Sequence, residues 1–206
     1  MQLNALNPLS DSKNEKDTFE AAPTPERLKK QERILILTAD DTQDLEFFYP
    51  YYRLNEEGYR VDVATPKGGS FKGKMGMGLK ETLSMDQVQA ADYSLLYIPG
   101  GKAPATLRKD DKVIQFVKQF ASSGKPIAAI CHGPQVLVTA DVIRGKKISA
   151  YSEVAKELQE AGATYSDEAL AIDGQFITAR VPGDLPRHLC GVIDVLQGRS
   201  SKKAAA

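Results

Sequence analysis

The chain has few of the residues from which disulfide frameworks and metal sites are built. Its 206 residues include two cysteines and two histidines, and Cys131 and Cys190 stand in dissimilar contexts. We therefore expect no disulfide framework, and the free thiols fit a reducing compartment. His188 and Cys190 are two residues apart, so a helix would place them on different faces and both are interpreted as structural. Neither a metal nor a cofactor is expected.

A surplus of positive charge is also missing. Lys and Arg together number 27, as do Asp and Glu, so the formal net charge is zero. This balance does not favour nucleic acid or an anionic membrane as a partner, although a local basic patch stays open. No apolar run is long enough to span a membrane, and the start of the chain lacks the features of a signal peptide. We expect a cytoplasmic protein.

Composition divides the chain into three parts. Residues 1–31 are polar and contain three prolines, which predicts an N-terminal extension outside the fold. Residues 32–198 have the length and apolar content of a single domain. The remaining residues, 199–206, are expected to form a flexible tail.

Short apolar runs alternate with segments of helical periodicity throughout the domain. This alternation predicts an α/β fold with a mostly parallel sheet covered by helices on both faces. Strands are expected at 34–37, 59–64, 93–98, 126–130, 148–150, 169–172 and 175–178. Helices are expected at 45–57, 104–107, 112–121, 136–142, 153–160 and 185–196.

Cys131 stands between a predicted buried strand and a predicted helix. The strand 126–130 ends at the cysteine, and Gly133-Pro134 follows before another apolar run. This pattern is typical of a turn that exposes a nucleophile above an α/β sheet, since proline is accepted in the first turn of a helix. The helix start is expected to lower the thiol pKa from its usual value of about 8.5 by up to about 1.5. The alternative is a buried structural cysteine.

Three loops are expected to meet at the carboxyl ends of the strands, where such sheets bind ligands. They are residues 40–44, the turn Pro99-Gly100-Gly101, and the turn at Cys131. If two of these loops abut, the backbone N–H groups of Gly101 and His132 could bind an oxyanion. His132 is either a general base or a packed, hydrogen-bonded histidine.

Residues 67–78 resemble a phosphate-binding loop without completing one. Gly68, Gly73 and Lys74 have the required spacing, but Met75 stands where a hydroxyl residue would hold Mg²⁺. Further glycines make the required helix unfavourable. We interpret this stretch as a mobile, hairpin-like excursion and not as a nucleotide site.

Four motifs together resemble the DJ-1/PfpI superfamily, and most closely its PfpI-type intracellular protease/amidase branch. The resemblance covers about residues 33 to 197. It implies a flavodoxin-like three-layer sandwich of the class I glutamine amidotransferase type, a nucleophilic cysteine, and dimers that can build into hexamers. The motifs are Ala-Ala-Ile-Cys-His-Gly-Pro-Gln at 128–135, Pro-Gly-Gly-x-Ala-Pro at 99–104, Asp-x-Glu-x-x-Tyr-Pro at 44–50 and Arg-Val-Pro-x-Asp-Leu at 180–185.

The resemblance implies several activities. They are peptidase or amidase action, glyoxalase action without glutathione, and deglycation of groups modified by methylglyoxal or glyoxal. The substrate would be a small carbonyl compound or a modified protein or nucleotide. The alternative is a non-catalytic, cysteine-based sensor of oxidative stress or a chaperone-like protein on the same scaffold.

Two positions depart from the family pattern as we align it. The family's glutamate beside the cysteine corresponds to Gln43, three residues before Glu46. The Gln43 amide could hold the thiolate but could not carry a proton. The protease-like members place an acid where Ala105 stands, so a triad completed by a neighbouring subunit is not supported. We therefore expect weakened activity with Cys131, His132 and Gln43 as the catalytic side chains.

Overall fold

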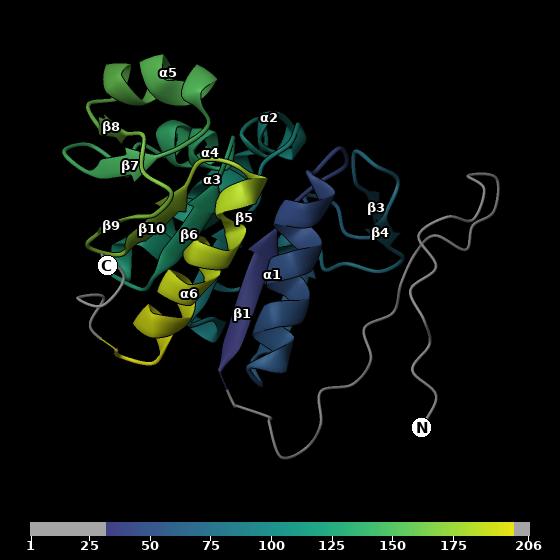
Figure 1. The fold of residues 1–206 in the computed structure, drawn as a ribbon. Coiled ribbons are helices and arrows are strands. Elements are labelled where there is room, and N and C mark those ends of the chain that lie inside the picture. The colour runs from purple at the N-terminus through teal and green to yellow at the C-terminus, as the bar shows by residue number, and fades with distance from the viewer. Residues whose placement is uncertain (1–31, 200–206) are drawn as a thin grey trace.

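A computed structural model describes residues 32–199, and within them the chain forms one three-layer α/β domain (Figure 1). The central sheet has six strands in the order β2-β1-β5-β6-β10-β9. Neighbours pair in parallel except β9, which is antiparallel to β10. The predicted mostly parallel sheet is thus confirmed. The strands are β1 (Arg33–Leu37), β2 (Arg60–Ala64), β5 (Leu95–Ile98), β6 (Ile127–Ile130), β9 (Ala171–Asp173) and β10 (Phe176–Ala179).

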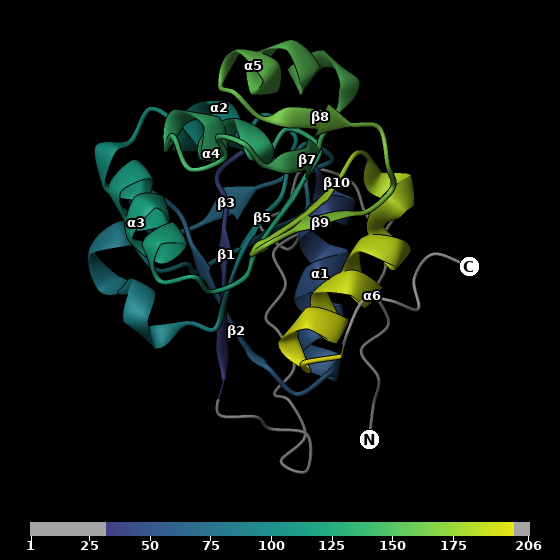
Figure 2. The same ribbon diagram turned by 90° about the vertical axis from the view of Figure 1, so that its left-hand side faces the viewer.

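Helices cover both faces of this sheet (Figure 2). One face is packed by α1 (Asp44–Glu56) and α6 (Leu185–Leu196). The opposite side holds the remaining helices, of which α5 lies farthest from the sheet. They are α2 (Ala103–Leu107), α3 (Asp111–Ser122), α4 (Pro134–Thr139) and α5 (Ala155–Glu160). Short 3₁₀ turns occupy Met85–Gln87, Ala90–Asp92, Ser152–Val154 and Pro182–Asp184.

Each central strand feeds two hydrophobic cores because its side chains alternate between the faces. In β1, Ile34 and Ile36 join the core beneath α1 and α6, whereas Leu35 and Leu37 join the other. All four side chains are fully buried. The continuous apolar run seen in the sequence therefore reflects a strand that is covered on both sides.

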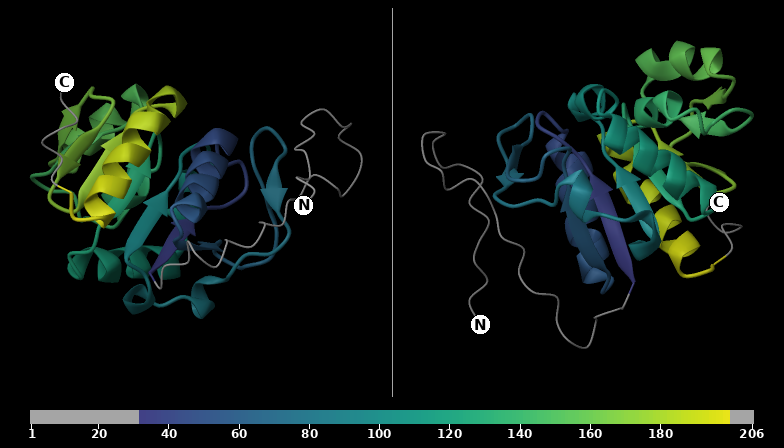
Figure 3. Two further views of the ribbon diagram at one scale, coloured as in Figure 1. Left: turned by 60° about the horizontal axis from the view of Figure 1, so that its bottom comes forward. Right: turned by 180° about the vertical axis from the view of Figure 1, so that it is seen from behind.

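Two small sheets lie at opposite ends of the large one (Figure 3). The hairpin of β3 (Phe71–Lys72) and β4 (Gly78–Leu79) occupies the stretch predicted to be hairpin-like. The parallel pair of β7 (Lys147–Ser149) and β8 (Thr164–Ser166) contains one strand that the sequence did not predict. Its three residues, Thr-Tyr-Ser, carry no apolar run, so β8 depends on its partner strand.

Several predicted boundaries move by a few residues, and α4 shows why. We predicted a helix over 136–142, but α4 starts at Pro134 and ends at Thr139. Asp141 adopts a φ of +52°, in the left-handed region that ends right-handed helices. The predictions for residues 1–31 and for nearly all of the tail fall outside the described residues. No helix within residues 32–199 is long and apolar enough to cross a bilayer.

Candidate active site

Cys131 occupies a sharp turn directly after β6, as the sequence predicted. Its φ is +60°, a conformation that costs an L-residue about 1–2 kcal/mol. Two backbone hydrogen bonds hold it there: its N–H donates to Ala179 (3.1 Å), and its carbonyl accepts from Tyr151 (3.0 Å). A Cβ at Gly133 would lie 2.4 Å from the Ile98 oxygen, so only glycine fits two positions after the cysteine.

The loop after β5 closes on this turn because its two glycines lack side chains. A Cβ at Gly100 would lie 2.6 Å from a Glu46 carboxyl oxygen and 2.7 Å from the Cys131 Cβ. A Cβ at Gly101, whose φ is +75°, would lie 2.4 Å from the Gln43 nitrogen. The three loops predicted to meet at the carboxyl edge of the sheet do meet.

Glu46, in the first turn of α1, places a fully buried carboxyl group beside Cys131. Its Oε2 accepts a hydrogen bond from the Gly100 N–H at 2.8 Å. Its Oε1 makes no well-aligned hydrogen bond with any described residue. Burial raises the pKa of Glu46 to about 7, although the Gly100 N–H and the Cys131 thiol oppose that rise. The acid is therefore close to half-protonated at neutral pH.

Gln43 does not take the place beside the thiol, so that expectation was wrong. Its side chain caps α1 instead: Oε1 accepts from the Leu45 N–H at 2.7 Å. Glu46 belongs to one of the four family motifs, but the sequence alone assigned it no role in the site. The missed signal was spacing, since Glu46 stands four residues before Pro50 and eight before Leu54, both buried on the inner face of α1.

The thiol pKa is also shifted in the direction opposite to our expectation. Burial, followed by the negative charge of Glu46, raises the pKa of Cys131 to about 12. The backbone N–H groups of Gly101 and His132 point toward the sulfur and lower it, but by less. The side chain is 7% exposed. A reaction at this sulfur therefore needs a neighbouring group that accepts its proton.

His132 is in position to accept it. Its Nδ1 lies 3.2 Å from the Cys131 Sγ, so the two consecutive side chains meet instead of diverging. Its ring also packs against Tyr151, with 5.1 Å between the ring centroids. Burial lowers the pKa of His132, and the charge of Lys74 lowers it further against an opposing effect of Glu153. The lowered pKa favours the neutral imidazole, which has a ring nitrogen that can accept a proton.

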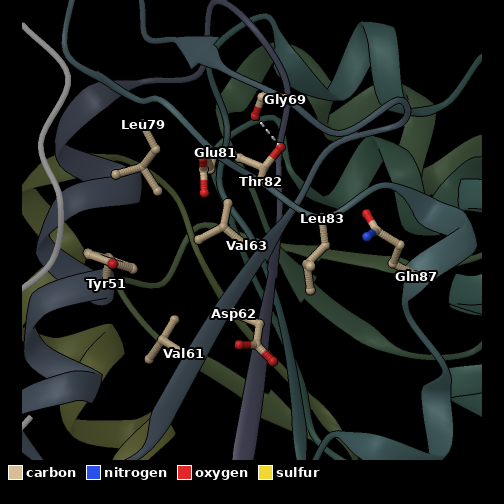
Figure 4. Close-up of a pocket in the computed structure, with 10 residues that line it drawn as sticks. All are labelled: Tyr51, Val61, Asp62, Val63, Gly69, Leu79, Glu81, Thr82, Leu83 and Gln87. Atoms are coloured by element: carbon tan, nitrogen blue, oxygen red, sulfur yellow. Dashed lines mark hydrogen bonds between the residues drawn. The ribbon is translucent and has the colours of Figure 1, made fainter. Parts of the chain in front are cut away.

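The other candidate residues lie elsewhere. His188 is fully buried on α6 with its Nε2 3.0 Å from the Ile177 oxygen, and Cys190 is exposed. Residues 32–199 contain no group of three potential metal ligands. A pocket of about 520 Å³ lies along the outer edge of β2, where Asp62 and Glu81 line it, and it does not include Cys131 (Figure 4).

Comparison with known proteins identifies the family of the chain. The model of the DJ-1/PfpI family matches residues 32–194. A deglycase of Pyrococcus abyssi is 41% identical over 153 residues, which cover 74% of this chain and 92% of the relative. Protein/nucleic acid deglycase 2 of Escherichia coli is 38% identical over 157 residues, covering 75% and 91%.

A solved structure extends the comparison to three dimensions. A two-domain protein of Anabaena variabilis, with DJ-1/ThiJ/PfpI-like and ferritin-like domains, aligns with a TM-score of 0.80 and 33% identity. The alignment covers 85% of this chain and about half (52%) of that protein. The family model matches most of the chain, and the chain belongs to the DJ-1/PfpI family.

Proposed function

We propose that this protein is a cysteine-dependent enzyme that acts on reactive 2-oxoaldehydes and on their adducts with amines. One observation carries the proposal: the Cys131 sulfur lies 3.2 Å from the His132 imidazole and beside a buried acid whose pKa is about 7. This arrangement pairs a nucleophile with an imidazole that can accept its proton and with an acid that can bind or release a proton near neutral pH. The deglycase names of the relatives from Pyrococcus abyssi and Escherichia coli support the same chemistry.

The first step forms a carbon–sulfur bond. The sulfur attacks the aldehyde carbon, and the thiol proton passes to His132 Nδ1. The N–H groups of Gly101 and His132 stabilise the charge on the former carbonyl oxygen until His132 protonates it, which gives a hemithioacetal. When the substrate is an amine adduct, the carbon–nitrogen bond breaks instead and the amine leaves with the proton from His132.

The second step moves a hydrogen within the intermediate. Glu46 removes the proton from the sulfur-bearing carbon and returns it to the adjacent carbonyl carbon, while His132 carries the hydroxyl proton of the first carbon to the carbonyl oxygen of the second. One carbon is oxidised and the other is reduced, so the product is a thioester of a 2-hydroxy acid and no external oxidant is needed. Water then hydrolyses the thioester and frees the thiol. An acid with a pKa of about 7 suits this role, because it must both bind and release a proton.

Amide hydrolysis is the less supported alternative. The acid expected of protease-like members is absent at Ala105, which lies exposed on α2.

We also propose that the chain assembles into dimers or hexamers, which light scattering would measure directly.

The experiment compares Cys131→Ala with Cys190→Ala in the purified protein. We expect the wild type and Cys190→Ala to convert methylglyoxal to lactate, and Cys131→Ala to lose at least about a thousandfold in kcat/KM. Cys190→Ala is the matched control because that thiol is exposed and lies away from the site. If the wild type is as inert as Cys131→Ala while peroxide selectively oxidises Cys131, the protein is a sensor and not this enzyme.

A further inference from the structure

Lys74 is a charged residue near the candidate site that the proposed chemistry does not use. It follows Gly73 in the stretch whose spacing resembles a phosphate-binding loop. The structure forms a β-hairpin here, with Lys74 in the turn between β3 and β4, and no helix follows. The stretch therefore lacks the geometry of a nucleotide-binding loop, and the position of Lys74 needs another explanation.

A buried carboxylate fixes the tip of this hairpin. Asp44 is 2% exposed, and its two oxygens accept the N–H groups of Met75 (2.8 Å) and Met77 (3.2 Å). A Cβ at Gly73 would lie 2.5 Å from the Asp44 Oδ1, so only glycine lets the tip sit this close. The backbone around Lys74 is thus held in one place.

Backbone pairing then connects Lys74 to the loop that carries a proposed oxyanion donor. The Lys74 N–H donates to the Thr42 oxygen at 2.8 Å, and Thr42 pairs in turn with Gly101. Two strand spacings of roughly 5 Å each separate the Lys74 and Gly101 backbones. A lysine side chain can bridge much of that distance.

The charge of Lys74 is available on this side of the molecule. The side chain is exposed, and no carboxylate within residues 32–199 forms an ion pair with it. Its charge reaches His132: burial lowers the pKa of that histidine most, the charge of Glu153 raises it, and the charge of Lys74 lowers it by a smaller amount. Lys72 differs, because its Cε lies 3.5 Å from the position of a Cβ at Gly76 and so its side chain lies across the hairpin.

We propose that Lys74 binds an anionic group of the substrate at the mouth of the Cys131 site. The favoured substrates are then reactive carbonyl compounds, or their adducts, that carry a carboxylate or phosphate near the reacting carbon. This inference rests on the proposed function for its biological meaning. Its physical content, a cation that draws anions to Cys131, can be tested without turnover.

The first test uses two alkylating reagents of nearly equal size, anionic iodoacetate and neutral iodoacetamide. Mass spectrometry measures the rate of modification of Cys131 by iodoacetate divided by the rate by iodoacetamide, in a Cys190→Ser background. We expect Lys74→Ala to lower this ratio about threefold to tenfold, between the effects of an exposed ion pair and a charge-assisted hydrogen bond. Lys74→Glu should lower the rate ratio further, and added salt should lower the ratio of the wild type because it screens the lysine charge. Lys72→Ala is the control and should leave the ratio unchanged.

The second test compares 4-carboxyphenylglyoxal with phenylglyoxal as substrates. Lys74→Ala should raise KM for the anionic compound about threefold to tenfold and leave the neutral one unaffected. A labelling ratio that is the same in the wild type and Lys74→Ala overturns the inference, even if both compounds are consumed. A lowered ratio without any turnover supports the inference and overturns the proposed function. If neither reagent reaches Cys131, no anion binds beside the sulfur and the inference fails.

Discussion

Glu46 and His188 are both fully buried titratable side chains, on the two helices that cover the same face of the sheet (Figure 2). Both ring nitrogens of His188 have partners, the Ile177 oxygen at 3.0 Å and the Tyr97 hydroxyl at 3.5 Å. Glu46 has one backbone partner, the Gly100 N–H, and its remaining polar neighbour is the Cys131 thiol. This difference in hydrogen-bond partners distinguishes a buried polar group with a structural role, His188, from one that can take part in a reaction, Glu46.

The same cause, burial, moves the two pKa values in opposite directions. It lowers the pKa of His188 from 6.5 to about 4 and raises that of Glu46 from 4.5 to about 7. In each case the neutral form is favoured. At neutral pH His188 is therefore neutral, whereas Glu46 is close to its midpoint. The contrast predicts opposite dependences of stability on pH at the two positions.

Among the variants that test this comparison, Glu46→Gln should have the largest effect, because it removes the proton-carrying acid. We expect kcat/KM to fall by at least about a hundredfold, since general acid–base catalysis contributes that much or more. A raised pKa means that stability is present below 4.5 and is lost as pH rises through about 7. Glutamine imitates the neutral acid, so the variant should be more stable than the wild type at pH 8.5, by up to about 3 kcal/mol.

Urea denaturation of both proteins at pH 5 and pH 8.5 measures this prediction. The two proteins should have similar free energies of unfolding at pH 5 and diverge at pH 8.5. If the free energies of unfolding of the two proteins changed by the same amount between pH 5 and pH 8.5, the ionised form of Glu46 would not destabilise the fold. The predicted contrast with His188 would then be wrong.

The second prediction concerns His188→Gln. A lowered histidine pKa means that its contribution to stability is present above 6.5 and is lost as pH falls toward 4. As pH falls over that range, the free energy of unfolding of the wild type should decrease by up to about 3 kcal/mol because of this group. The variant should not show this part of the decrease. Its kcat/KM at pH 7.5 should stay within about threefold of the wild type. A loss of activity as large as that of Glu46→Gln would place His188 in the site.

The smallest effect is expected for Gln43→Ala, which removes the cap of α1. Loss of a helix cap costs about 1 kcal/mol, so the free energy of unfolding should fall by that amount. Because Glu46 and not Gln43 lies beside the thiol, kcat/KM should change less than about twofold. The opposite pattern, an unchanged stability with a tenfold loss of activity, would return Gln43 to the site.

Patterns of apolar residues predicted most of the fold. Runs such as 34–37 identify strands covered on both faces, and the regular spacing of the final helix identified its bounds, 185–196, without error. The cysteine turn could also be predicted, because Gly133 and Pro134 leave few other conformations. Strand β8 could not, since its pairing with β7 and not its composition makes it extended.

The electrostatics of the site could not be predicted from spacing. The helix start near Cys131 suggested a lowered thiol pKa, but burial and the charge of Glu46 outweigh the N–H groups that face the sulfur. Both effects depend on which side chains the three loops bring together. The position of Glu46 itself could have been predicted from the inner face of α1.

The hydrogen bonds of His188 also determine the direction of the Tyr97 hydroxyl group in the core. A carbonyl oxygen can only accept, so the Ile177 oxygen fixes the ring proton on Nε2 and leaves Nδ1 as an acceptor. The Tyr97 O–H must then donate to Nδ1, and the Tyr97 oxygen can only accept hydrogen bonds from other groups. Burial, followed by the charge of Glu46, raises the pKa of this same phenol. A main-chain oxygen of β10 thereby orients, through two rings, the hydroxyl dipole of a tyrosine that is fully buried in the core.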